Sequence, residues 1–114
     1  MSLRLTPERL AAAYDFLRAF PPFDRWRLPP GDEVRFHVAY VDNWYGHYSR
    51  LRRSHRIDIS AVTVGHGDTL LRTMAHEMVH VRQNLLNKST VHNAEFRRLG
   101  GVICSRFGWD PKAF

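Results

Sequence analysis

The sequence predicts a single α+β domain spanning residues 1–114, and three observations support this prediction. The chain has 114 residues, of which 44% are hydrophobic and 25% charged, as in one ordinary globular domain. Apolar residues recur at helical spacing towards both ends of the chain. Between them, from residue 33 to residue 59, apolar and polar residues alternate as in strands. Helices grouped before and after a run of strands are typical of the α+β class.

The first expected element is a helix over residues 7–20. Thr6 supplies a capping hydroxyl, Pro7 suits the first helical position, and Glu8 places negative charge at the positive end of the helix dipole. The apolar face of this helix is expected to consist of Leu10, Ala13, Tyr14 and Leu17. The prolines at positions 21 and 22 end the helix.

Three strands are expected next, over residues 33–40, 45–51 and 55–59, in a mainly antiparallel sheet. In the first strand Val34, Phe36 and Val38 alternate with polar neighbours, which is typical of a half-buried strand. In the last strand Ile57 and Ile59 are expected to face the core.

Two helices complete the expected order α-β-β-β-α-α. The first begins after Asp68, a good N-cap residue, and ends near residues 87–90. Its apolar face is expected to contain Leu71, Met74, Ala75, Met78, Val79, Leu85 and Leu86. The last helix runs over residues 93–107, with a core stripe of Phe96, Leu99, Ile103 and Phe107. Gly100 and Gly101 weaken its middle by about 1 kcal/mol each relative to alanine.

Two histidines, His76 and His80, lie four residues apart on the first of these helices. Residues at this spacing project from one helix face, so both imidazoles can reach one metal ion. Glu77 follows His76 directly, and its carboxylate can lie beside the metal as a general base that takes a proton from a zinc-activated water. The pattern predicts a Zn²⁺ site with Glu77 as its base. The alternative is a pair of polar residues on a partly exposed helix face.

A third metal ligand is expected from the segment that follows, because catalytic zinc usually has three protein ligands and one open position. His92 is the preferred candidate, since a turn at residues 87–90 can return it to the metal and imidazole suits zinc. Glu95 is the competitor, either as a carboxylate ligand or as an acid that orients a ligand histidine. The single cysteine, Cys104, excludes a four-cysteine zinc site and is expected in the core.

These residues resemble the SprT-like (Spartan) family of zinc metalloproteases. The family pattern L-x-x-T-x-x-H-E-M-x-H followed by H-G-x-E-F is matched at Thr73, His76, Glu77, Met78, His80, His92, Glu95 and Phe96. The resemblance implies a zincin-like minimal metallopeptidase domain, with zinc ligands at His76, His80 and His92 and with Glu77 as catalytic acid/base. It also implies peptide-bond hydrolysis, which in eukaryotic members is directed at DNA-linked proteins. Asn93 departs from the family's glycine, and the C-terminal zinc ribbon of many members is not expected.

The charge balance favours a polyanionic partner such as DNA. The net charge is +6 and the pI about 10.2, and nearly all the excess is arginine. Arg50, Arg52, Arg53 and Arg56 crowd the expected hairpin over residues 45–59, where they either hold phosphate or guard an edge strand. The same hairpin is the expected edge for pairing with an extended protein substrate. No signal peptide or membrane-crossing stretch is expected, which predicts a cytoplasmic protein.

Two rival functions stay open beside a zinc peptidase. One is a non-proteolytic zinc-binding module, and the other is a basic nucleic-acid-binding domain. The presence of Glu77 favours the peptidase, because a structural zinc site has no use for a base. Stabilisation of the oxyanion needs a further donor, for which His66, Tyr45 and Tyr48 are the candidates.

Overall fold

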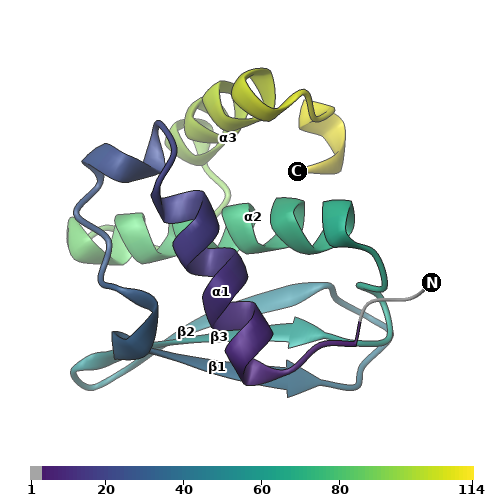
Figure 1. Cartoon of the computed structure of the whole chain (residues 1–114). Helices are drawn as coiled ribbons and strands as arrows, with labels where there is room; N and C mark the ends of the chain where they lie inside the picture. Colours follow the sequence, from purple (N-terminus) through teal and green to yellow (C-terminus); the bar gives the residue numbers. More distant parts are fainter. Residues whose placement is uncertain (1–3) are drawn as a thin grey trace.

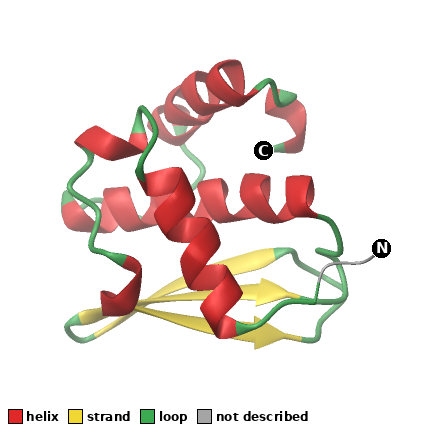
Figure 2. Cartoon of the chain, viewed as in Figure 1, coloured by secondary structure: helices red, strands yellow, loops and turns green. Residues whose placement is uncertain are grey.

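A computed structural model, which describes residues 4–114, has three helices on one side of a three-stranded sheet (Figures 1 and 2). The main elements are α1 (Pro7–Arg18), β1 (Val34–Ala39), β2 (Gly46–Leu51), β3 (Ser54–Ser60), α2 (Gly67–Leu85) and α3 (Ala94–Phe107). Short 3₁₀ turns lie at η1 (Phe23–Arg25), η2 (Gly31–Glu33) and η3 (Pro111–Ala113). Helix α2 lies between the sheet and α3 (Figure 1). The α+β class is confirmed.

The sheet is mixed, so the prediction of a mainly antiparallel sheet is wrong. Its strand order is β1-β3-β2, in which β2 pairs antiparallel and β1 pairs parallel with β3. The chain leaves β1, crosses to the far edge of the sheet and returns through a tight hairpin as the central strand. Ile57 and Ile59 of that strand are fully buried, as expected. Strand β2 is therefore an edge strand, and β3 is not.

Helix α1 begins as predicted but ends two residues earlier. The Oγ1 atom of Thr6 accepts a hydrogen bond from the Arg9 amide at 3.1 Å, and the expected apolar face is buried. The helix ends at Arg18 because Phe20 precedes a proline, and proline disfavours the helical backbone of the residue before it.

Helix α2 begins before Asp68, so the prediction of Asp68 as its N-cap is wrong. His66 occupies the N-cap position, and the Asp68 carboxylate instead accepts a hydrogen bond from the Trp109 indole at 3.0 Å. At the other end Leu85 and Leu86 are 39% and 42% exposed, so they do not extend the buried face. Both leucines instead line an open hollow with Trp26 and Arg82.

Within residues 4–114, no helix has the length and apolarity needed to cross a membrane.

Helix α3 follows its prediction closely. The Asn93 side chain caps it by accepting from the Phe96 amide at 3.0 Å, and Gly108 ends it with a left-handed φ of 77°. Phe96, Ile103 and Cys104 are buried, whereas Leu99 and Phe107 are only partly so. The cap matters for the site, because it fixes the backbone immediately after His92.

Candidate metal centre

Three imidazoles converge where α2 faces the loop before α3. The Nε2 atom of His92 lies 3.1 Å from Nε2 of His76 and 3.2 Å from Nε2 of His80. All three ligand atoms lie within 4.8 Å of one another. Two nitrogens bound to the same tetrahedral zinc at about 2.0–2.1 Å are separated by about 3.3 Å. The spacing of the three histidines is therefore compatible with one small metal ion.

The protons of the two helix histidines point away from this centre. Nδ1 of His76 lies 2.7 Å from the Phe114 main-chain oxygen, and Nδ1 of His80 lies 2.8 Å from Oε1 of Gln83. Since both oxygens only accept, both Nδ1 atoms must donate. Burial lowers the pKa of His76 to about 4 and also lowers the pKa of His80, so both rings are neutral at pH 7. Each Nε2 consequently presents a lone pair to His92.

Lone pairs that meet in this way need a cation or a proton between them. A single proton on Nε2 of His92 can be donated fully to only one of the two neighbours. A metal ion accepts all three lone pairs at once, so the donor set suits a metal centre better than a hydrogen-bonded histidine cluster.

Gln83 joins the helix to the loop that carries His92. Its side chain is 1% exposed. Its amide nitrogen donates to the Val91 carbonyl at 3.0 Å, and its amide oxygen accepts from Nδ1 of His80. Phe96 packs against the other side of the cluster, with its ring centre 4.5 Å from that of His92. These contacts hold the exposed His92 ring against the two histidines of α2.

Glu95 lies outside the cluster. Its carboxylate accepts a hydrogen bond from Nζ of Lys88 at 2.7 Å, and this contact lowers the pKa of Glu95. Of the two candidates for a third ligand, the structure brings His92 to the helix histidines and leaves Glu95 at the surface.

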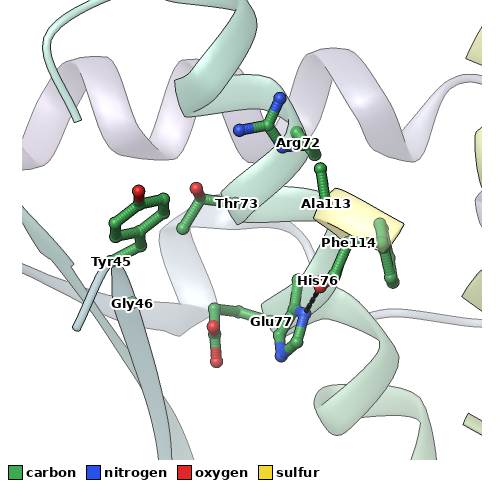
Figure 3. Close-up of a pocket in the computed structure, with 8 residues that line it drawn as sticks. All are labelled: Tyr45, Gly46, Arg72, Thr73, His76, Glu77, Ala113 and Phe114. Atoms are coloured by element: carbon green, nitrogen blue, oxygen red, sulfur yellow. Dashed lines mark hydrogen bonds between the residues drawn. The ribbon is translucent and has the colours of Figure 1, made fainter. Parts of the chain in front are cut away.

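Glu77 is a buried carboxylate beside the histidines. It is 4% exposed, and it lines two adjoining hollows of about 170 and 310 Å³, the larger of which also contains all three histidines. Figure 3 shows Glu77 and His76 projecting side by side from α2. A Cβ atom at Gly46 would lie only 2.9 Å from Oε2 of Glu77, so glycine lets β2 approach the carboxylate. Burial, and secondarily Asp58, raise the pKa of Glu77 to about 8.

The three candidates for an oxyanion donor are placed differently. Tyr45 lines the smaller hollow and is 52% exposed, whereas the Tyr48 hydroxyl lies 2.6 Å from Nδ1 of His55. His66 lies at the start of α2 and lines neither hollow. Arg72, one helical turn before His76, also lines the smaller hollow and is a donor that the sequence analysis did not consider (Figure 3).

Gln83 and Phe114 are two further site residues that the sequence analysis missed. Gln83 could have been found, because a polar residue three positions after His80 lies on the same helix face. Phe114 carries no such signal, since its contact with His76 spans 38 residues of sequence.

No protein-family model, curated protein or solved structure matches this chain. The likeness to SprT-like proteases therefore rests on the sequence motif.

Proposed function

We propose that this chain is a zinc-dependent peptidase in which His76, His80 and His92 hold the metal and Glu77 is the general base. The observation that carries the proposal is a buried carboxylate beside three convergent imidazoles. A purely structural zinc site is closed by four protein ligands, whereas three imidazoles leave one position open for chemistry. The likeness to SprT-like proteases supports the same activity.

The chain's own residues supply the proton transfers. When bound, Zn²⁺ supplies Lewis acidity towards water and the substrate carbonyl. Burial raises the pKa of Glu77 to about 8 in the absence of metal, and the positive charge of Zn²⁺ beside it would lower that pKa again. The ionised Glu77 carboxylate would then take a proton from the attacking water and pass it to the leaving amine. Arg72 and Tyr45 line the hollow that contains Glu77, so their guanidinium and hydroxyl groups are the donors we assign to the developing oxyanion.

An extended protein segment is the substrate form that suits this arrangement. Strand β2 is an edge strand, and its residues Gly46, His47 and Tyr48 line the same hollow as the three histidines. A peptide that adds to this edge by main-chain hydrogen bonds runs directly past Glu77.

The test compares wild type with Glu77→Gln, which keeps the shape of the side chain and removes its basicity. Both proteins should bind one zinc, and Glu77→Gln should lower cleavage of an unfolded protein such as casein about 10²–10⁴-fold. A chelator should abolish wild-type cleavage, and added zinc should restore it. If wild type binds zinc but cleaves nothing, with or without DNA, the chain is instead a non-proteolytic zinc-binding module.

We also propose a nucleic-acid partner for the arginine-rich side of the molecule. Arg27, Arg50 and Arg53 line a hollow of about 630 Å³ between the hairpin turn and the loop after α1, with Glu33 as the acid among them. Guanidinium groups bind phosphate well. Added salt weakens such binding, because it reduces the free energy gained when counterions are released from the nucleic acid. Arg27→Ala/Arg53→Ala should lower affinity for single-stranded DNA and flatten its salt dependence. Equal affinity of this variant and wild type at every salt concentration would exclude this surface.

A further inference from the structure

An apolar pocket of about 430 Å³ adjoins the metal centre between α3 and η3. Its walls include Phe96, Gly100, Gly101, Pro111 and Phe114. It also contains His76 and His92, so whatever fills the pocket lies next to the proposed metal. The pocket is distinct from the hollows that contain Glu77, and Phe114 forms a wall between the two spaces.

The two glycines in the middle of α3 shape this pocket. A Cβ atom at Gly100 would lie 2.8 Å from the Phe114 ring, so glycine lets the ring pack directly on the helix. A Cβ atom at Gly101 would meet no atom within 4 Å, so that position opens onto free space. Glycine is unfavourable inside a helix. The absence of side chains at Gly100 and Gly101 makes the pocket deeper, which is a physical reason for two glycines at these positions.

The rim of the pocket is basic. Arg97 and Lys112 are its charged lining residues and both are exposed, while no aspartate or glutamate lines it. One nitrogen of the Arg97 guanidinium donates to the His92 main-chain oxygen at 3.1 Å, which holds this charge beside the pocket mouth. An occupant with an apolar body and a neighbouring negative charge matches both features.

We propose that the apolar pocket is a specificity site that receives a large apolar side chain of the protein substrate, next to the bond that is cleaved, and favours an acidic residue beside it. The proposal deepens the peptidase function and rests on it. His76 and His92 line both the apolar pocket and the proposed metal centre. A substrate side chain that packs against these two histidines therefore holds its own backbone close to Glu77.

Gly101→Leu is the most direct test, because the new side chain enters open space and fills the pocket without a clash. The probes are unstructured glycine- and serine-rich peptides that carry either phenylalanine or alanine at one central position, followed by glutamate. Wild type should cleave the phenylalanine peptide at least tenfold more efficiently than the alanine peptide. Gly101→Leu should lower the ratio of the two cleavage efficiencies to within about twofold of one, because the filled pocket can no longer receive the phenylalanine ring.

The matched control is Val102→Leu, which adds bulk at a position that is 48% exposed and does not line the pocket. It should keep the wild-type preference.

Lys112→Glu tests the charge at the rim of the pocket. Wild type should cleave a peptide with glutamate beside the phenylalanine more efficiently than one with lysine there, and Lys112→Glu should reverse this order. Equal loss of both peptides in Gly101→Leu, or an unchanged preference, would overturn the proposal.

Peptide binding to zinc-loaded Glu77→Gln separates this proposal from the peptidase function. Calorimetry should show at least tenfold tighter binding of the phenylalanine peptide than of the alanine peptide, and Gly101→Leu should abolish the difference. This result with no cleavage by wild type would overturn the peptidase function and leave the pocket as a binding site. Equal binding of both peptides would overturn the pocket, whatever wild type cleaves.

Discussion

His80 and His55 are both buried histidines that contact the same tyrosine, yet their ring nitrogens have different partners. The Tyr48 ring stacks on the His80 ring at 6.3 Å between centres, and the Tyr48 hydroxyl lies 2.6 Å from Nδ1 of His55. Burial lowers the pKa of both histidines. The difference lies in the second nitrogen of each ring.

Nε2 of His55 accepts a hydrogen bond from the Arg50 guanidinium at 2.8 Å, so its Nδ1 carries the proton and donates to the Tyr48 oxygen. Both nitrogens of His55 are thus satisfied by the protein. Nε2 of His80 instead faces Nε2 of His92 at 3.2 Å. Burial and a lowered pKa therefore do not identify a metal ligand, whereas an unsatisfied lone pair that converges with others does.

The largest effect that separates the two histidines should be on zinc affinity. His80→Ala should weaken zinc binding by at least about 100-fold, because two nitrogens hold a metal far less well than three. His55→Ala should leave zinc affinity within about twofold and lower the free energy of unfolding by about 1–3 kcal/mol. Competition with a chromophoric chelator and urea denaturation measure the two quantities. An equal loss of zinc in both variants would break the distinction.

Added zinc should stabilise the protein only where the three histidines are intact. Free zinc at 100 times its dissociation constant should raise the unfolding free energy of wild type by about 2.7 kcal/mol. His55→Ala should keep this increment, and His80→Ala should lose most of it at the same zinc concentration. Thermal unfolding with zinc and with chelator checks the prediction. An undiminished increment in His80→Ala would place the metal elsewhere.

Gln83 should act on the metal through His80. Gln83→Leu fills the same buried space but removes the acceptor of Nδ1, so zinc affinity should fall about 10–100-fold. Gln83→Glu keeps an acceptor for His80 and loses the donor to Val91, so it should retain more affinity than leucine. Competition with a chromophoric chelator measures the zinc affinity of both variants. Wild-type zinc affinity in Gln83→Leu would contradict a role for Gln83 at the metal centre.

The smallest effect concerns the pH dependence of stability. Since the folded pKa of His55 is lowered, the unfolded chain takes up a proton below about pH 6.5 that the folded chain does not. Stability from neutral His55 is complete above that pH and declines below it, by at most about 1.4 kcal/mol per pH unit. The free energy of unfolding of wild type should therefore exceed that of His55→Gln by less at pH 5 than at pH 6.5. Both proteins are measured with a chelator present, so that no metal contributes. An advantage that grows on acidification would contradict this sign.

The sequence predicted those parts of the molecule that depend on local spacing. The α+β class followed from hydrophobic periodicity, and the grouping of His76, His80 and Glu77 followed from helix geometry. The strand order did not, because parallel pairing of β1 with β3 joins segments with no local signal between them. Asp68 was misplaced as a cap because Trp109, 41 residues away, binds its carboxylate.

X-ray absorption at the zinc edge, on protein loaded with one equivalent of zinc, identifies the metal ligands themselves. Wild type should show three imidazole nitrogens at about 2.0–2.1 Å and an additional oxygen. His92→Ala at full loading should show one imidazole fewer. A shell with sulfur, fewer than three imidazoles in wild type, or an unchanged shell in His92→Ala would contradict a centre built from His76, His80 and His92.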